Sequence, residues 1–588
     1  MAPREGAAGR SGSFRVTAGA ALAAVILLAG WGIAEAGRPA SASSPGTAPM
    51  TDTAAGDPLA TSRIDLKPGP SNAVLTARGD LTRLGWDQTE PSLSPSALTS
   101  GSFGKRAAFP VDGKIYAQPL YAPGLTIDGT SHDVVITATE HDSVYAFDAH
   151  AASNAAPLWR TSLLMPGART FQAATDRVGT RRLCDSIVPE VGINSTPVID
   201  WDTKTVYVVA LDVEHGAMIY RLHELDLLTG RDRLPSTVVS AAVPGQGLGN
   251  ANGTVAFIAS DEQQRLALTE VGGTVYVGFA SWCDLNPYHG WLLGYDVRTL
   301  HRTIVYDASP NEYASGFWES RAGLGVDGHG HLFAVTGNGP FDLASGGQDA
   351  GDTVLDLVPS GGTLRPIDYF TPFDQRCLDE HDQELGSGSP LMVPGHHELI
   401  LSTKTGIVYV LDEASLGEYR STPNPCTPSV RTRTDIDHIK QELPEGTVPG
   451  GMWGTWAYAA SGNNEFVYAA GAQGALTQWR LAADGALMPT PVARASLAFA
   501  YPGAIPVVTS DDSAPGSGIV WTVDQTHGAT LRAFAADDVA HELWDSGRDP
   551  ARDALDPGEF DHFTVPTTAD GMVIVGDQGH LEVYAELR

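Results

Sequence analysis

The chain has 588 residues, of which 42% are hydrophobic and 18% charged, and its formal net charge is −32. This length and composition allow a large buried core. The negative charge argues against a nucleic-acid partner, because phosphate binding needs a basic surface, and it favours a solvated acidic surface on an exported protein.

The N-terminus has the pattern of an export signal. Arginines precede the apolar run VTAGAALAAVILLAGWGIAEA, and the run ends in an A-x-A-like cleavage site at residues 34–36. We expect residues 1–36 to be a signal peptide or, because the run is close to a membrane-spanning length, an uncleaved membrane anchor. The Ser/Pro/Ala-rich residues 37–72 are predicted to be a disordered spacer. The protein is therefore expected to be secreted or extracytoplasmic, with membrane contact only through an uncleaved N-terminal segment.

A strand unit recurs about every 50 to 80 residues from residue 115 onward. Each copy has an apolar strand, a turn of Gly, Asp or Asn, a second apolar strand, and a third that ends close to an Asp, as in VVITATEHDSVYAFD and LILSTKTGIVYVLD. Recurrence of this kind indicates one supersecondary module repeated many times. We count eight modules, with inner strands expected in IYAQPLYA, NSTPVID, RLALTEV, SRAGLGV, SGSPLMV, GTWAYAA, GAIPVVT and FTVPTTA.

The eighth module ends with the chain and lacks an outer strand. The segment FGKRAAFPVDG (103–113) has the character of an outer strand and has no module of its own. Pairing it with the last module would close a ring and remove the exposed sheet edges. The predicted fold is therefore all-β: residues 73–588 form an eight-bladed β-propeller in which an N-terminal strand closes the last blade.

The chain has four cysteines, Cys184, Cys283, Cys377 and Cys426. In an exported protein they are expected to form two disulfides. Their order suggests Cys184–Cys283 and Cys377–Cys426, which is one of three connectivities that four cysteines allow. The absence of C-x-x-C argues against a zinc site of the usual kind, and the absence of C-x-x-C-H against covalent haem.

The stretch ARGDLTRLGWDQTEPSLSPSAL, followed by FGKRAAFPVDGKIYAQPLY, resembles the opening of quinoprotein (PQQ-dependent) alcohol dehydrogenase-like propellers. The resemblance extends from about residue 73 to the end of the chain. It implies an oxidoreductase that oxidises an alcohol or a sugar with PQQ and calcium. Many propellers with PQQ-like repeats have no demonstrated cofactor, so the alternative is a non-catalytic platform at the cell surface that binds or assembles a protein partner.

Four motifs resemble family segments that contain site residues. GFWESRAGLGVDGHGHLFAVTGN is similar to a family stretch whose Trp is the floor under the quinone and whose Asn binds calcium, which implies these roles for Trp318 and Asn338. HDQELGSGSPL places Asp382 at the position of the catalytic base, which also serves the metal. STKTGIVYVLD places Lys404 beside the quinone oxygens, and DVEHGAMIYRLHELD places Glu214 at the position of a calcium-binding Glu.

These residue types suit the implied chemistry. A hard divalent cation prefers oxygen ligands and would polarise a quinone carbonyl as a Lewis acid. Lys404 would add positive charge near the developing anion, Asp382 would remove the alcohol proton, and Trp318 would hold the ring flat.

Two departures from the family stand against this reading: His381 replaces the family's Trp, and its vicinal Cys-Cys pair is absent. Each assigned residue also has an ordinary structural interpretation. The same residue types would occur at these positions if they were a buried aromatic between blades, residues in turns and solvated carboxylates. The segment SWCDLNPYHGW likewise offers Asp284, Tyr288 and His289 either to the central channel or to a rigid loop anchored by a disulfide.

Overall fold

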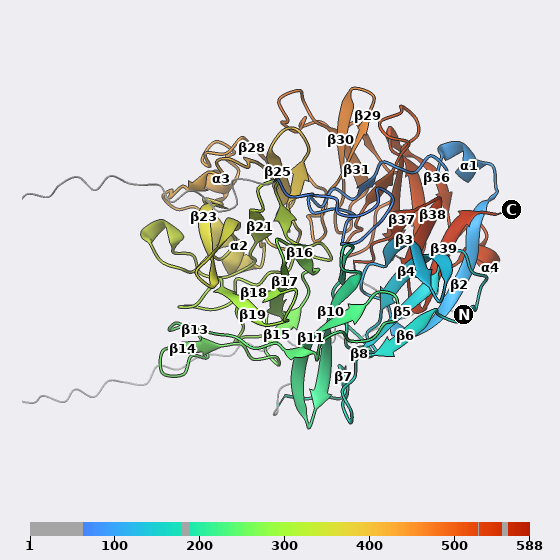
Figure 1. Ribbon diagram of the computed structural model, residues 1–588. Helices are drawn as coiled ribbons and strands as arrows, with labels where there is room; N and C mark the ends of the chain where they lie inside the picture. Colours follow the sequence, from blue (N-terminus) through green and yellow to red (C-terminus); the bar gives the residue numbers. More distant parts are fainter. Residues whose placement is uncertain (1–62, 179–182, 184–186, 527, 556–562, 588) are drawn as a thin grey trace, which may run out of the picture. The chain divides into compact units, whose positions relative to one another are not determined.

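The computed structural model describes residues 63–178, 183, 187–526, 528–555 and 563–587. The predicted signal peptide, most of the predicted spacer and Cys184 lie outside the described residues. In the described part of the chain the strands form nine sheets, eight of which have four or more strands (Figure 1).

The sheets follow one another along the sequence. The first contains β3 (Leu120–Ile127), β4 (Thr130–Ala138), β5 (Ser143–Asp148) and β6 (Trp159–Ser162). The second contains β7 (Arg169–Gln172), β8 (Glu190–Val191), β9 (Val198–Asp200), β10 (Thr205–Glu214), β11 (Ala217–Asp226) and β12 (Thr237–Val238). The small hairpin of β13 (Ala242–Pro244) and β14 (Thr254–Ala256) follows. The third sheet contains β15 (Glu262–Gln264), β16 (Thr269–Val271), β17 (Thr274–Ser281), β18 (Trp291–Asp296) and β19 (Arg302–Asp307).

The fourth sheet contains β20 (Gly325–Val326), β21 (Leu332–Val335), β22 (Val354–Ser360), β23 (Thr363–Thr371) and β27 (Glu418–Tyr419). The fifth contains β24 (Leu391–Val393), β25 (Glu398–Ser402), β26 (Val408–Asp412) and β28 (Gln441–Leu443), and the sixth β29 (Ala457–Ser461), β30 (Asn464–Ala470), β31 (Leu476–Arg480) and β32 (Ala493–Arg494). The seventh contains β1 (Trp86–Asp87), β33 (Val507–Thr509), β34 (Ile519–Asp524), β35 (Thr530–Ala535) and β36 (Asp538–Asp545), and the eighth β37 (Thr567–Ala569), β38 (Met572–Gly576), β39 (Gln578–Glu586) and β2 (Phe103–Lys114). The helices are short: α1 (Pro95–Thr99), η1 (Leu343–Ser345), α2 (Gln375–His381), α3 (Pro428–Arg431) and α4 (Pro550–Asp553).

The all-β prediction is confirmed, and the predicted inner strands are present. They are β3, β9, β16, β20, β24, β29, β33 and β37. Most pairings within the sheets are antiparallel between sequential strands, as in a repeated meander. The central strands are buried on both faces; in β10, for example, nine of ten residues are buried. Burial on both faces explains why these strands read as continuous apolar runs rather than as alternating patterns.

The two ends of the propeller segment meet in one sheet. Strand β2, near the beginning, pairs antiparallel with β39, the last strand, from Phe103 opposite Glu586 to Lys114 opposite Gln578 (Figure 1). This is the pairing predicted for residues 103–113. The ring of Phe103 packs against Trp544 at 5.1 Å and Trp521 at 5.6 Å between ring centroids, so β2 is also joined to the seventh sheet.

Residues 74–90 make contacts that the sequence analysis does not foresee. This segment hydrogen-bonds to a residue in or beside the inner strand of every one of the eight larger sheets. Its partners are Tyr121 in β3, Ile199 in β9, Thr269 in β16, Val326 in β20, Met392 in β24, Tyr458 in β29, Val508 in β33 and Gly571 beside β37. We call residues 74–90 the central segment.

Two buried arginines hold the central segment in place. Arg78 donates to the carbonyl oxygens of Pro506 and Trp456, both at 2.6 Å, and Arg83 donates to the carbonyl oxygen of Leu324 at 2.9 Å. Gly85 has a φ of +61°, and a Cβ there would lie 2.2 Å from the Arg78 guanidinium. A side chain at this position is therefore excluded by both the backbone conformation and the close approach.

The last residues of the predicted spacer, from residue 63 on, contact the fourth sheet. The amide of Ile64 donates to the carbonyl oxygen of Gly328 at 3.0 Å, and the side chains of Ile64 and Leu66 pack against its hydrophobic cluster.

Candidate functional site

Three of the five site residues predicted from the sequence line one cavity of about 350 Å³: Trp318, Asp382 and Lys404. A fourth, Asn338, donates its side-chain amide to Asp382 Oδ1 at 2.9 Å. Each follows or precedes a strand or helix end: Trp318 precedes β20, Asn338 follows β21, Asp382 caps α2 and Lys404 follows β25. Residues beside the inner strands of neighbouring sheets come together in this way even when the sequence separates them widely.

Lys404 links two carboxylates. Its ammonium lies 2.6 Å from Asp382 Oδ1 and 3.1 Å from Glu384 Oε1, and its side chain is 12% exposed. Burial opposes the charged form, but the Glu384 and Asp382 carboxylates outweigh it and raise the pKa of Lys404. Lys404 is therefore a fixed positive charge in the cavity.

Asp382 is the exposed member of this group. It ends α2 in the left-handed conformation, with a φ of +54°, and its side chain is 64% exposed. Oδ1 accepts from both Asn338 and Lys404, and no group in the described part of the chain hydrogen-bonds to Oδ2. One carboxylate oxygen is thus positioned by the protein while the other is available to a ligand.

Asn338 carries a buried side-chain oxygen that lacks a partner. The residue is 9% exposed, and among the described residues nothing hydrogen-bonds to its Oδ1. Its neighbour Gly337 leaves no room for a side chain, because a Cβ there would lie 2.7 Å from Trp318 and 2.8 Å from Glu384. The glycine therefore lets the T-G-N turn approach Trp318 and Glu384 closely.

Trp318 is 8% exposed, and its ring meets the edge of Tyr288 at 6.5 Å between centroids. The Arg265 guanidinium lies over the Trp318 ring, 5.3 Å from its centroid. The Trp318 ring is thus an aromatic wall of the cavity, and the Arg265 guanidinium covers its face.

Sequence reasoning did not assign Glu384 or Arg265 to the site. Glu384 is 3% exposed and also accepts from Ser387 Oγ at 2.8 Å. It lies two residues after Asp382 in the same motif, so the second acidic residue of D-Q-E was the available signal. No local pattern marks Arg265, which lies in the inner-strand segment of a sheet distant in sequence from that motif.

The segment SWCDLNPYHGW contributes to the cavity, because Cys283 and Asp284 line its wall. The Tyr288 hydroxyl donates to Asp284 Oδ1 at 3.1 Å. Burial, together with the nearby negative charge of Glu384, raises the pKa of Asp284 to about 6.

His289 connects this segment to two neighbouring loops through its imidazole ring. Its Nδ1 lies 3.0 Å from the carbonyl oxygen of Ser309 and its Nε2 lies 2.8 Å from that of Leu248. Carbonyl oxygens only accept, so both contacts are satisfied when the ring is doubly protonated. Burial opposes the charged form, but Asp307, 3.4 Å from Nδ1, helps to raise the pKa of His289. Glu262 adds a further acceptor, to the His289 backbone amide at 3.1 Å.

Glu214 does not lie at the cavity. It is the last residue of β10, and both of its carboxylate oxygens accept from Arg221, at 2.6 and 3.0 Å. The hydrogen bond with Arg221 lowers the pKa of Glu214. The structure therefore separates Glu214 from the other four predicted site residues.

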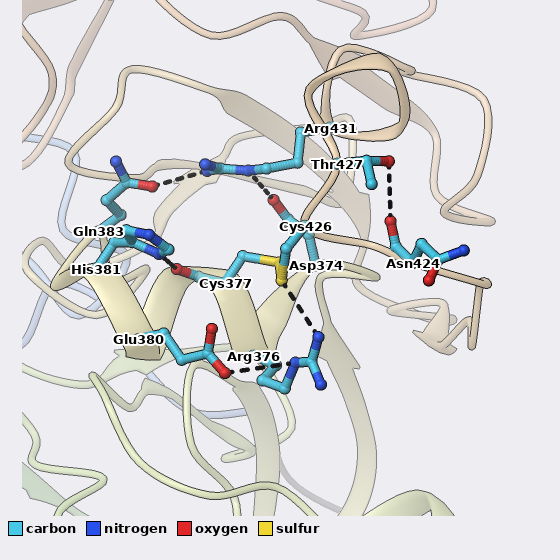
Figure 2. The surroundings of a disulfide bond; sticks show 10 residues. All are labelled: Asp374, Arg376, Cys377, Glu380, His381, Gln383, Asn424, Cys426, Thr427 and Arg431. Carbon is cyan, nitrogen blue, oxygen red and sulfur yellow. Dashed lines mark hydrogen bonds and ion pairs between the residues drawn. A yellow bond between two sulfur atoms is a disulfide. The ribbon is translucent and has the colours of Figure 1, made fainter.

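The helix that carries Asp382 is fastened by a disulfide. Figure 2 shows Cys377, in α2, bonded to Cys426, so the predicted Cys377–Cys426 pair is confirmed. Arg431 reinforces the link, donating to Asp374 at 3.0 Å and to Gln383 at 2.8 Å (Figure 2). The pairing predicted for Cys184 concerns a residue outside those described and stays a prediction.

No family model matches the sequence, and no curated protein is recognisably similar to it. Among solved structures, the chain resembles a quinohemoprotein alcohol dehydrogenase from Pseudomonas putida HK5, with 13% identity and a TM-score of 0.52 over 88% of this chain and 80% of that one. It also resembles the quinohemoprotein alcohol dehydrogenase from Comamonas testosteroni, with 12% identity and a TM-score of 0.52 over 89% of this chain and 83% of that one. A third similar structure is a europium-containing methanol dehydrogenase, with 12% identity and a TM-score of 0.55 over 88% of this chain and 99% of that one. At these identities the likeness concerns the fold alone: the chain has the β-propeller fold of these dehydrogenases.

Proposed function

We propose that this protein is an exported quinoprotein-type oxidoreductase that binds PQQ and calcium in the cavity and oxidises an alcohol or a sugar. The observation that carries the proposal is that Trp318, Asp382 and Lys404 line one cavity, and that Asn338 hydrogen-bonds to Asp382. These residues come from three separate motifs, and 86 positions separate the first from the last. Surface residues chosen by accident would seldom meet in this way.

The donor groups suit the implied cofactors. Among the described residues the buried Oδ1 of Asn338 has no partner, and it is the kind of oxygen that a hard cation takes. The carboxylates of Asp382 and Glu384 accept from the side-chain and backbone nitrogens of the same residue. Lys404 and Arg265 offer positive charge to the carboxylates of PQQ, and Trp318 offers an aromatic face. When bound, PQQ would supply the two-electron acceptor that protein side chains lack.

The remaining chemistry belongs to the side chains. Asp382 would accept the substrate hydroxyl proton at Oδ2, while Asn338 and Lys404 hold Oδ1 and so keep the carboxylate oriented. Lys404 would also stabilise negative charge that develops nearby. Glu384, buried against Lys404, balances the ammonium when no ligand is bound.

We also infer that the eight larger sheets are the blades of a closed eight-bladed ring. Two observations support this: β2 pairs with β39, and the central segment reaches the inner strands of all eight sheets. In such a ring the sheets keep only short, protected edges.

Export remains part of the proposal, with residues 1–36 as the signal or anchor, residues 37–72 as the spacer and residues 73–588 as the propeller. In the residues that the structure describes, no helix is long and apolar enough to span a membrane. N-terminal sequencing of protein recovered from outside the cytoplasm should begin at Gly37 if the signal is cleaved after Ala36. An intact N-terminus on membrane-bound protein would favour the anchor.

Reconstitution tests the activity. The purified protein is titrated with PQQ in the presence and absence of calcium, and dye reduction is measured with a panel of alcohols and aldoses. We expect calcium-dependent binding, and we expect Asp382→Asn to lower turnover by about 100-fold or more while PQQ still binds. Exposed Asp435 provides the control, because Asp435→Asn should leave turnover unchanged.

The non-catalytic platform is the second candidate, and specific contacts favour it. Lys404 already forms ion pairs with both Asp382 and Glu384, and the carboxylate of Glu214 is paired with Arg221. A propeller with these charges satisfied needs no metal to be stable. If the folded protein neither binds PQQ nor reduces dye, the oxidoreductase proposal is wrong and the platform remains.

A further inference from the structure

Arg265 is a cation of the cavity without a carboxylate partner. It lies between β15 and β16 and is partly buried. Among the described residues no carboxylate oxygen lies within ion-pair distance of it, and its one side-chain hydrogen bond is a long one, 3.4 Å to Gln263 Oε1. Its guanidinium is instead held over two aromatic rings, Trp318 at 5.3 Å and Phe563 at 5.8 Å from the centroids.

The other charged groups of the cavity are already paired. Lys404 holds Asp382 and Glu384, and Asp284 accepts from a tyrosine hydroxyl. Arg321, the remaining cavity arginine, donates to both the backbone and the side-chain oxygen of Asn194. Among the described residues of the cavity, Arg265 is thus the charged group whose N–H donors have no carboxylate acceptor and only one long hydrogen bond.

This arrangement has an electrostatic cost that a ligand could remove. Burial lowers the pKa of Arg265, which expresses the unfavourable desolvation of its charge. Ring faces offset part of that cost through cation–π attraction, but they offer no lone pairs to the five guanidinium N–H groups. A carboxylate satisfies a guanidinium with two parallel hydrogen bonds.

The position of Arg265 also affects which flat ligands can stack on Trp318. The guanidinium lies over Trp318, the ring proposed above as the aromatic wall for a planar cofactor, and both residues line the same cavity. A flat ring that stacks on this surface must displace the guanidinium. Displacement is favourable when the incoming ring carries an anion that the guanidinium can then bind, and unfavourable when the ring is neutral.

We propose that Arg265 makes the cavity selective for flat ligands that carry a carboxylate, by covering Trp318 until such a ligand displaces it and then binding that carboxylate. The identification of PQQ as the ligand rests on the proposed function, whereas the preference for a carboxylated ring does not. Sequence motifs gave no indication of this residue.

A matched pair of probes tests the inference: quinoline-2-carboxylate and neutral quinoline, which share a ring system. Affinities are measured by calorimetry for the wild type, Arg265→Gln, Arg265→Lys and the exposed control Arg298→Gln. We expect the wild type and Arg298→Gln to prefer the carboxylate by about 10-fold or more, as for a hydrogen bond to a charged group. Arg265→Gln should lose this preference without weaker quinoline binding, and Arg265→Lys, which keeps the charge but not the two-pronged geometry, should be intermediate.

The outcomes separate this inference from the proposed function. Equal preferences in the wild type and Arg265→Gln, or no binding of either probe to the wild type, would overturn the role of Arg265. If the carboxylated probe behaves as expected but PQQ does not bind, the proposed cofactor is wrong and the selectivity stands. If PQQ binds Arg265→Gln as tightly as the wild type, the inference is wrong whatever the cofactor. Thermal unfolding of each variant identifies a loss of binding that comes from misfolding.

Discussion

Phe103→Ala probes the pairing of the first long strand with the last. Phe103 is 1% exposed and opens β2, where it packs against Trp544 and Trp521 of the seventh sheet while its backbone pairs with Glu586 in β39. Phe103 therefore joins the N-terminal strand to the seventh sheet through its side chain and to the eighth through its backbone.

The size of the effect follows from burial and from ring contacts. Truncating a fully buried Phe to Ala costs about 3–5 kcal/mol of unfolding free energy, because transfer energy is lost and a cavity remains. The edge-on contact with Trp544, whose planes cross at 87°, is of the kind that contributes about 0.5–1.5 kcal/mol beyond buried area. We therefore expect the upper part of this range, about 4–5 kcal/mol.

Equilibrium urea unfolding, followed by tryptophan fluorescence and by circular dichroism, measures the change. Phe103→Leu serves as the graded control and should cost about 1 kcal/mol, since most of the apolar volume is kept. Limited proteolysis should also cut Phe103→Ala near β2 before the rest of the chain. A loss below about 1 kcal/mol for Phe103→Ala, with no new cleavage, would refute the idea that this strand is an integral part of the last sheet.

Three further predictions concern the surroundings of the cavity. Replacing Cys377 by Ser should destabilise the protein by about 4 kcal/mol in the chain-entropy treatment of a loop of about 50 residues, and dithiothreitol should lower the unfolding midpoint of the wild type by more than that of the variant, which keeps only the other predicted disulfide. Gly337→Ala should lower both stability and ligand affinity, because a Cβ there collides with Trp318; a variant with wild-type unfolding and binding would contradict this. The folded-state pKa of His289 is raised, so its contribution is fully present below the unfolded pKa of about 6.5 and is lost as pH rises through the folded pKa. His289→Gln should therefore reduce the fall in stability that the wild type shows over that pH window, and identical pH profiles would show that the ring is not protonated.

Much of the architecture could be predicted because it depends on local patterns. The strands have apolar residues on both faces and end in turns, and the same signature returns eight times, so the inner strands could be located one by one. Even the pairing of residues 103–113 with the last strand followed from counting, since one module lacked an outer strand and one strand lacked a module.

The site was predictable only in part. Trp318, Asn338, Asp382 and Lys404 occur in motifs with recognisable neighbours; three of them line the cavity, and Asn338 hydrogen-bonds to Asp382. Glu214 also matched a motif, but its hairpin strands run for ten residues each and Arg221 binds its carboxylate away from the cavity. A motif specifies a local conformation, and it cannot specify where a long hairpin ends relative to a distant sheet.

By itself the sequence determined the strand content, the positions of the inner strands and the strand that pairs with the last one, because these depend on apolar patterns and turns within a few residues of one another. Only the tertiary structure decided that Arg265 covers Trp318, that Lys404 pairs with Glu384, and that the central segment contacts all eight sheets. Those contacts join side chains and backbone groups tens to hundreds of residues apart, and they depend on how neighbouring sheets stack, which no short stretch of sequence encodes.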